Sequence, residues 1–528
     1  MITENVRYVG LDVHKRVVEA CLVDAAGNVV HRERFALNRR TLELFATKVL
    51  RPTDHVALEA TTNCWAVADA LRPHVARVVV SNPMATKAIA QAKVKTDKVD
   101  AHVLAQLLRC DFLPEVWQPD ETTRRLRELT GRRSALVGQR TAMRNRIHSV
   151  LAMRLIEAPT RLFNAEGLAW LTTVELDDQA RLLVDSDLRQ LEFLQVQVDT
   201  LDVELARRGH ANEQVKLLMT LPGVDVATAE AVLAAWGDPK RFPDGDHAAS
   251  YLGLVPSTKQ SANQCYHGPI TKHGNSQARW MLIEAAQHLD KHPGPLGYFF
   301  RRLLKKKNRN VAVVASARKL AMIGWQMLTT CEPYRYAIPR STETKLATLR
   351  VKATGQRRPG GVPKGQKAVA TQRGQAGGSR TIRSLHDVCR SEGLPSPLPL
   401  SSGERRTVKE AGCDVFVDQI GRTQVVPRRT NAPKANAEAN HAAIAHQDAM
   451  ATGSLAAATS AGRPCGRTSG RVRQASYQVQ TSAKCRLSGF RPHRAGEQGD
   501  EAPPPAPPTL SSVPGRRRAA AKKSTSAS

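Results

Sequence analysis

The stretch Tyr8-Val-Gly-Leu-Asp-Val-His14 decides the fold, because it places one carboxylate, Asp12, inside an otherwise apolar strand. A charged carboxylate buried in such a strand is costly unless a cation compensates it. Val56-Ala-Leu-Glu-Ala60 also sets an acid, Glu59, among apolar residues, and Lys95-Thr-Asp-Lys-Val-Asp-Ala101 carries Asp97 and Asp100 three residues apart at an expected helix start. Segments of this kind can converge on a divalent metal, whose preferred ligands are hard oxygens.

The residues around the first segment predict a mixed β-sheet with flanking helices. Strands are expected at residues 6 to 13, 17 to 23, 29 to 35, 56 to 60 and 75 to 80, with helices at 41 to 50, 65 to 71 and 96 to 109. The order β-β-β-α-β-α-β-α is that of an α/β ribonuclease-H-like fold, in which an antiparallel meander opens a mixed sheet.

Four acids form the candidate catalytic set. Glu59 follows Asp12 by 47 residues, and Asp97 follows Glu59 by 38. Asp97 and Asp100 share one face of the first turn of the expected helix, where the helix dipole favours anions. A single strand Asp is usually a hydrogen-bond acceptor and a helix-start pair is usually a cap. The joint pattern predicts two Mg²⁺ ions that hold the attacking and leaving oxygens of a phosphodiester.

Composition indicates what kind of partner the chain binds and in which compartment it is expected. The 528-residue chain has a net charge of +30 and a pI near 10.2, which predicts a polyanionic partner, above all nucleic acid. It has no run of eighteen apolar residues and no secretory pattern at the N-terminus, so no membrane span is expected. Nine scattered cysteines without CxxC pairs are typical of a reducing cytoplasm, and not of a disulfide scaffold or zinc module. We expect a cytoplasmic, nucleoid-associated bacterial protein.

Four regions are expected along the chain: a catalytic domain at 1–115, a helical region at 116–212, a further domain at 213–340 and a tail at 341–528. The tail carries 31 Lys and Arg against 12 Asp and Glu, and its aromatic residues are Phe416, Tyr477 and Phe490. These few large apolar groups cannot offset the entropy lost when the chain becomes ordered, so the tail is predicted to be disordered. The folded part is expected to end near Pro339.

The helical region carries an apolar stripe at coiled-coil spacing in residues 120 to 156 and a second one in 188 to 205. Such helices favour dimerisation through a coiled coil, and an intramolecular helical hairpin remains open. The first stretch is rich in arginine, which favours a surface for phosphates, although such runs are often merely solvated. These arginines are Arg124, Arg125, Arg132, Arg133, Arg140, Arg144 and Arg146.

The region 213–340 is predicted to be mainly helical. Leu221-Pro-Gly-Val224 resembles a helix-hairpin-helix element, in which the turn at Gly223 aims backbone N–H groups at a phosphate. An ordinary helix connection with Pro-Gly as breaker is the alternative. Lys272 is a second expected nucleic-acid contact in this region.

The motifs together resemble the Asp-Glu-Asp-Asp transposases of the insertion-sequence 110, 116 and 902 type, with the Piv-type DNA invertases as close relatives. The resemblance covers about residues 6 to 340. Beyond the acidic motifs it rests on Leu221-Pro-Gly-Val224, Ala249-Ser-Tyr-Leu-Gly-Leu-Val-Pro256 and Gly268-Pro-Ile-Thr-Lys-His-Gly-Asn275. It implies a RuvC-like N-terminal domain, a coiled-coil insert and a C-terminal transposase domain.

The resemblance also implies a nucleophile and an RNA partner. The family carries a serine followed by Gly in the polar loop after Pro256, and the matching residue here is Ser261, followed by Ala262. Alanine restricts φ where glycine does not, and Ser257 is the less favoured alternative. The family implies covalent serine–DNA strand exchange and a structured guide RNA whose pairing selects the DNA sequence.

The sequence therefore predicts a transposase or site-specific recombinase that forms a dimer or tetramer through its coiled coil. A Holliday-junction-resolvase-like nuclease would need the carboxylates but not Ser261. A non-catalytic nucleic-acid-binding protein would need neither.

Overall fold

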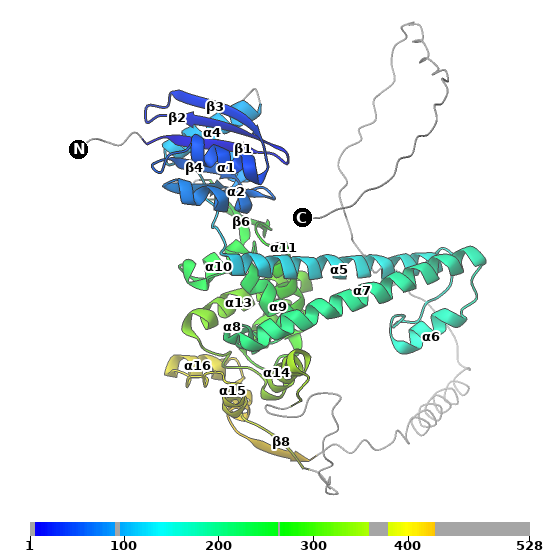
Figure 1. The fold of residues 1–528 in the computed structure, drawn as a ribbon. Coiled ribbons are helices and arrows are strands. Elements are labelled where there is room, and N and C mark those ends of the chain that lie inside the picture. Colours follow the sequence, from blue (N-terminus) through cyan, green and yellow to red (C-terminus); the bar gives the residue numbers. More distant parts are fainter. Residues whose placement is uncertain (1–5, 90–95, 262–263, 358–378, 428–528) are drawn as a thin grey trace, which may run out of the picture. The chain divides into compact units, whose positions relative to one another are not determined.

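The computed structural model describes residues 6–89, 96–261, 264–357 and 379–427. The N-terminal domain contains a five-stranded sheet of order β3-β2-β1-β4-β5 (Figure 1). Its strands are β1 Tyr8–Val13, β2 Val17–Val23, β3 Val29–Ala36, β4 His55–Glu59 and β5 Arg77–Ser81. β1, β2 and β3 form an antiparallel meander, and β4 and β5 run parallel to β1. The predicted meander and mixed sheet are confirmed.

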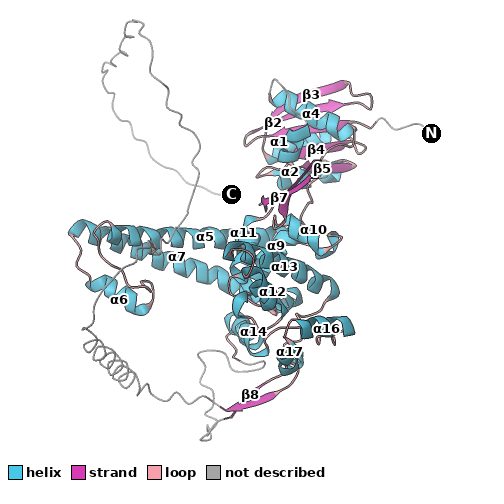
Figure 2. Ribbon diagram, turned by 180° about the vertical axis from the view of Figure 1, so that it is seen from behind, coloured by secondary structure: helices cyan, strands magenta, loops and turns pink. Residues whose placement is uncertain are grey.

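Helices cover both faces of this sheet (Figure 2). On one face, Leu11 and Leu58 pack against α1 Arg39–Lys48 and α2 Cys64–Leu71. On the other face, Cys21 and Val23 of β2 pack against α4 Asp97–Arg109. This division follows from the two-residue period of a strand, which sends alternate side chains to opposite faces. The short elements η1 Arg72–His74 and α3 Pro83–Ile89 complete the domain.

Gly10 in the middle of β1 lets α4 approach the sheet closely. A Cβ atom at this position would overlap the carbonyl oxygen of Ala101 and approach the amide nitrogen of Ala105. Only glycine avoids this overlap, because it alone has no Cβ. The first turn of α4, which carries Asp97 and Asp100, lies one helical turn before Ala101 and is therefore held over the end of β1 that carries Asp12.

The helical region is an antiparallel hairpin of α5 Glu121–Ala152 and α7 Asp178–Ala211, with α6 Ala165–Thr173 packed at its far end. Leu136, Leu194 and Val198 fill the seam between the two long helices. The stripes that suggested a coiled coil between protomers are thus buried within one chain. Sequence periodicity is the same for both arrangements, which is why it left them open.

The C-terminal domain is mainly helical, as predicted. Its helices are α8 Glu213–Met219, α9 Val226–Trp236, η2 Pro239–Arg241, α10 Gly245–Tyr251, α11 Ser276–Ala286, η3 Leu289–Lys291, α12 Pro295–Leu304 and α13 Arg309–Thr330. The fully buried side chains of Trp236 and Phe300 belong to its core. The polar segment expected to be a loop is instead a β-hairpin of β6 Pro256–Ser261 and β7 Gln264–Ile270.

The expected end of the folded part near Pro339 is wrong. α14 Pro339–Thr354 crosses that boundary, and its Leu346 and Leu349 are buried in the core of the C-terminal domain. Further elements follow: β8 Ser379–Ile382, α15 Leu385–Ser391, α16 Ser402–Glu410, α17 Asp414–Ile420 and β9 Gln424–Pro427. Aliphatic side chains such as Leu385 build this packing without tryptophan, so average composition concealed it. The rest of the expected tail, residues 358–378 and 428–528, lies outside the described residues.

Among the residues that the structure describes, one helix, α13, is long and apolar enough to cross a membrane by length and composition. Its Ala317, Leu320 and Ala321 are buried in the core of the C-terminal domain, and the helix contacts α10, α11 and α12. Such burial is what the core helix of a globular domain shows.

Candidate metal centre and nucleic-acid interface

Asp12 and Glu59 lie side by side at the ends of two parallel strands. The ladder between β1 and β4 pairs Gly10 with Ala57 and Leu11 with Leu58. Asp12 and Glu59 are the next residue on each strand. Since paired residues of neighbouring strands share a face, both acids belong to the face of Gly10, which α4 covers.

α4 adds the other two acids to the same place. The side chain of Thr96 caps this helix by accepting a hydrogen bond from the amide of Val99 at 3.4 Å, so Asp97 and Asp100 fall in its first turn. The ligand atoms of Asp12, His14 and Asp97 lie within 4.8 Å of one another.

His14 bridges two of the acids. Its Nε2 is 3.2 Å from Oδ2 of Asp12 and 3.4 Å from Oδ1 of Asp97. Its side chain is 52% exposed, whereas that of Asp12 is 17% exposed. His14 is therefore more exposed than Asp12, whereas Asp97, at 49%, is about as exposed as His14.

The electrostatics of Asp12 reflect this crowding. Burial raises the pKa of the Asp12 carboxyl, His14 opposes the rise, and the charges of Asp97 and Asp100 add to it. A second cationic group at this position would therefore stabilise the ionised form of Asp12. Carboxylate oxygens gathered around a half-buried acid suit a hard divalent cation, and an imidazole nitrogen at the rim is compatible with one.

Sequence reasoning missed two residues of this centre. His14 ends the stretch Tyr8-Val-Gly-Leu-Asp-Val-His14, but the sequence pattern predicts no role for it. Glu19 on β2 pairs directly with Asp12 in the antiparallel ladder and is buried, with Arg34 at 3.9 Å as its ion-pair partner. The signal for Glu19 was the one used for Asp12, a carboxylate inside an apolar strand.

Ser261 lies at the end of β6, opposite Gln264, and is exposed. Lys259 and Tyr266 form the preceding pair on the same face of the hairpin, because they stand two residues away on each strand. Ser257, the alternative, is partly buried at the base of the hairpin. Exposure thus favours Ser261 over Ser257 as a residue that can meet a large substrate.

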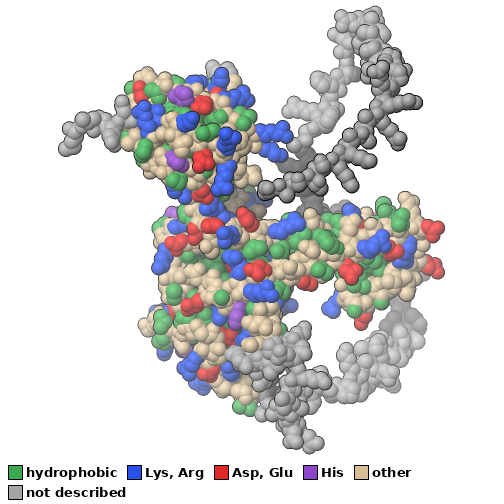
Figure 3. Space-filling view, in the orientation of Figure 1, with side chains coloured by type: hydrophobic (Ala, Val, Ile, Leu, Met, Phe, Trp, Pro, Cys, Tyr) green, Lys and Arg blue, Asp and Glu red, His purple; other side chains and the backbone are tan. Residues whose placement is uncertain are grey.

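The arginines of α5 are mostly engaged within the chain. Arg124 pairs with Asp69, Arg125 with Glu121, Arg133 with Asp202 and Arg146 with Asp187, while Arg140 donates to Gln195. Arg144 lies over the ring of Phe163, with its guanidinium carbon 5.1 Å from the ring centroid. Of the seven, Arg132 is exposed and has no partner among the described residues. Along the α5–α7 arm in Figure 3, basic and acidic side chains are interspersed, so the expected continuous basic surface is largely neutralised.

Gly223 forms the left-handed turn between α8 and α9, with a φ of 75°. A Cβ atom at Gly223 would overlap the backbone of Ala285, yet Gly223 itself is exposed. Lys345 of α14 fixes the turn from within by donating to the carbonyl oxygens of Leu221 and Val224 at 2.6 and 3.0 Å. Lys272 is exposed and also left-handed, with a φ of 57°. Both expected phosphate contacts are therefore accessible.

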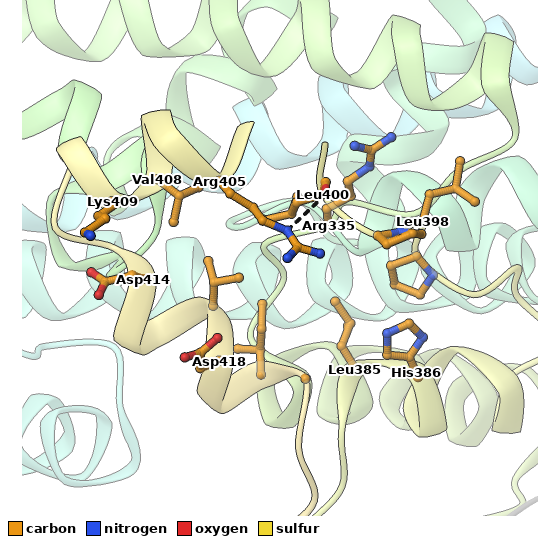
Figure 4. A pocket seen from close by; sticks show the side chains of 15 residues that line it. Arg335, Leu385, His386, Leu398, Leu400, Arg405, Val408, Lys409, Asp414 and Asp418 are labelled. Atoms are coloured by element: carbon orange, nitrogen blue, oxygen red, sulfur yellow. Dashed lines mark hydrogen bonds between the residues drawn. The ribbon is translucent and has the colours of Figure 1, made fainter. Parts of the chain in front are cut away.

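A cavity of about 440 Å³ lies in the part of the chain beyond residue 335 (Figure 4). It is lined by Arg335, His386 and Leu398, and by Arg405, which donates to the carbonyl oxygen of Leu400 at 3.2 Å. None of the four candidate catalytic acids lines it. The cavity is therefore separate from the metal centre.

Comparison with known proteins agrees with this geometry. The profile of an IS110-type DEDD transposase domain matches residues 9–154, and that of the IS116/IS110/IS902 transposase family matches residues 215–297. The transposase for insertion sequence element IS1111A of Coxiella burnetii is 25% identical over 347 residues, which are 63% of this chain and 92% of that protein. The pilin gene-inverting protein of Moraxella bovis is 28% identical over 339 residues, covering 62% of this chain and 97% of that protein.

The transposase for insertion sequence element IS1328 of Yersinia enterocolitica is 24% identical over 330 residues, covering 62% of this chain and 97% of that protein. The two profiles match in order along the chain, and the first of them spans all four candidate acids. In these two segments the chain is similar to the IS110-type DEDD transposases and to the IS116/IS110/IS902 family of transposases.

Proposed function

We propose that this chain cuts and rejoins DNA with the four carboxylates as a divalent-metal centre and Ser261 as the nucleophile. The observation that carries the proposal is the gathering of Asp12 and Asp97 around one histidine, with Glu59 next in the ladder and Asp100 on the same helical turn. The enzyme class follows from the family, whose members are named as transposases and DNA-inverting proteins.

Each acid has a distinct part in this proposal. Asp12 and Glu59 are fixed by the sheet, and Asp97 and Asp100 by the helix cap, so the four carboxylates would hold the two Mg²⁺ ions that the acidic pattern predicts. Such ions supply charge stabilisation to the phosphate in an in-line displacement. His14 is half-exposed between Asp12 and Asp97, so it would give up this place to a bound cation.

In the strand-exchange step, the Ser261 oxygen forms a bond to the phosphorus and the bond from phosphorus to the leaving DNA oxygen breaks. The serine proton is lost to solvent water, and the leaving DNA oxygen is protonated from solvent. Lys259, on the same face of the hairpin as Ser261, is suited to hold the phosphate charge near the serine. An oxygen at the end of the second DNA strand then attacks the phosphorus, and the bond between phosphorus and Ser261 breaks.

The proposal also includes two partners, a guide RNA and a second copy of this chain. A structured guide RNA, implied by the resemblance, would choose the DNA sequence by pairing. A homo-oligomer is supported by α7, where Leu182, Phe193 and Val196 lie on one face and are 65%, 63% and 57% exposed. Since the α5–α7 seam is closed within the chain, this outer face would be the one that meets a second copy.

The test compares Asp12→Asn and Ser261→Ala with the parent protein on DNA that carries the element ends. Asp12→Asn should abolish cleavage and the Mg²⁺-induced rise in melting temperature, because it removes a ligand. Ser261→Ala should keep the Mg²⁺-induced rise and lose the covalent protein–DNA adduct, detected after denaturation. Ser257→Ala, the matched control on the same hairpin, should retain the adduct.

Metal-dependent cleavage that persists in Asp12→Asn would contradict the metal centre. An adduct that persists in Ser261→Ala but disappears in Ser257→Ala would move the nucleophile to Ser257. Cleavage without any adduct in the parent protein would favour a metal-dependent nuclease.

A further inference from the structure

The turn between α12 and α13 carries the densest run of basic residues in the C-terminal domain. The segment Arg301-Arg-Leu-Leu-Lys-Lys-Lys-Asn-Arg309 holds six basic residues and no acid. Every residue from Leu304 to Val311 is exposed, as are Arg301 and Arg302. The segment lies beyond residue 297, where the second family profile ends.

Two of these arginines fix the turn to the domain. Arg301 donates to the carbonyl oxygens of Asp290 and His292 at 2.9 and 2.8 Å. Arg309 donates to the carbonyl oxygen of Gln287 at 2.9 Å and pairs with Asp290 at 3.4 Å. The turn is thus held at both ends, which lowers the entropy that a ligand would have to remove.

The three lysines between these anchors are unpaired. The side chains of Lys305, Lys306 and Lys307 have no hydrogen-bond or ion-pair partner among the described residues, and the backbone N–H groups of Lys306 and Lys307 donate to Leu303. They precede the N-terminus of α13, a helix of 22 residues with no acid in its first turn. The lysine charges and the helix dipole therefore add at the same place, and both favour an anion.

An exposed aromatic ring stands beside this charge. Tyr298 is 37% exposed on α12, and the guanidinium carbon of Arg302 lies 6.0 Å from its ring centroid. Unpaired lysines next to an arginine and a tyrosine are suited to a phosphate backbone, since these side chains supply much of the contact that proteins make with phosphate and sugar.

The contrast with α5 decides between this turn and the arginine-rich helix as the surface for nucleic acid. Five of the seven α5 arginines have hydrogen-bond or ion-pair partners on other side chains of the same chain, whereas the lysines of the turn have none in the part of the chain that the structure describes. A basic side chain that is already paired with an acid displaces few counterions from DNA when it meets a phosphate, whereas an unpaired basic side chain displaces more.

We propose that the α12–α13 turn, through Lys305, Lys306 and Lys307, docks the backbone of duplex DNA. The proposal deepens the function above by assigning the surface that holds DNA, and it rests on DNA being the substrate. Because the lysines contact phosphates, this docking contributes affinity without choosing the sequence.

The test measures binding of the full chain to a labelled random-sequence DNA duplex by fluorescence anisotropy across a KCl series. The variant is Lys305→Gln with Lys306→Gln and Lys307→Gln. Each phosphate contact contributes roughly 0.9 to the slope of log K against log salt. We expect the variant slope to be shallower by about two to three units, with a melting temperature like that of the parent because the three residues are exposed.

The matched control removes the same charge from α1 by Arg39→Gln, Arg40→Gln and Lys48→Gln. These residues are also exposed, and α1 covers the sheet face opposite the metal centre. The control should keep the parent slope. An equal loss in both variants would overturn the proposal, since it would reflect net charge alone.

Two further probes distinguish other anionic partners. A loss confined to a structured RNA hairpin, or to vesicles of anionic lipid, would also overturn the assignment to DNA. The lysine variant should still cleave DNA at saturating concentration and low salt, whereas Asp12→Asn should bind DNA and fail to cleave it. The two outcomes separate failure of the docking surface from failure of the catalytic centre.

Discussion

At the scale of single residues, Glu230 is a carboxyl that the fold buries with only partial compensation by Arg208. It lies on α9, is 2% exposed, and its Oε1 has no hydrogen-bond partner within the described residues. Burial raises the pKa of the Glu230 carboxyl to about 7, and Arg208 opposes the rise. A carboxyl in this state is protonated more readily in the folded chain than in the unfolded one.

Glu230→Gln should change how stability depends on pH. Because the folded-state pKa exceeds the unfolded value near 4.5, unfolding releases a proton between these values, and the parent loses stability as pH rises through this window. The loss amounts to about 3 kcal/mol above pH 7, since one pKa unit corresponds to about 1.36 kcal/mol. Urea unfolding at pH 5 and pH 8 should show the variant gaining on the parent at pH 8. A gap that does not change with pH would contradict the buried charge.

At the scale of elements, the proposed metal centre depends on how closely α4 packs on β1. Gly10 allows the contact, and the contact sets where Asp97 and Asp100 lie. Neither acid is close to Asp12 in the sequence. The geometry of the centre therefore rests on a residue that carries no functional group.

Gly10→Ala should disable the centre while leaving all four acids in place. The added methyl meets backbone atoms of α4, which cannot move aside as a side chain can, so we expect a loss of at least about 1–3 kcal/mol. The Mg²⁺-induced rise in melting temperature should disappear. Gly138→Ala on α5 is the matched control, because a Cβ there meets nothing within 4 Å, and it should add roughly 0.5–1 kcal/mol. If Gly10→Ala keeps the Mg²⁺ response, the close packing of α4 does not position the acids.

At the scale of the whole molecule, residues 379–427 are joined to the C-terminal domain by buried contacts. Arg350 on α14 pairs with Glu392 at 2.6 Å, and both side chains are less than a tenth exposed. The ring of Phe416 meets that of His292 with centroids 5.8 Å apart. Burial lowers the pKa of His292 to about 4, so this histidine is neutral in the packed core at physiological pH.

Two truncations test this packing. A chain that ends after residue 427 should melt like the full chain, because the sequence beyond it is basic and poor in aromatic residues. A chain that ends after residue 357 loses Glu392 and leaves Arg350 without its partner. Breaking a buried pair in this way costs roughly 3–5 kcal/mol, so this chain should melt at a clearly lower temperature. Equal melting of all three chains would show that residues 379–427 add nothing to the stability of the core.

The sequence by itself determined the strands, their meander order, the helix that carries Asp97 and Asp100, and the four acids. These features follow from the periods of strands and helices and from the cost of a lone charge in an apolar strand, and both are local properties. The approach of Asp12 and Glu59 to each other could be read in the same way, because β1 and β4 run parallel and end at one edge of the sheet.

Only the tertiary structure decided which charges are paired. It set His14 between Asp12 and Asp97, neutralised most arginines of α5, and left the lysines of the α12–α13 turn unpaired. It also closed the α5–α7 seam within one chain and extended the folded part beyond Pro339. Pairing across long separations depends on which faces meet when elements pack, and the periodicity of a single element does not specify its partner.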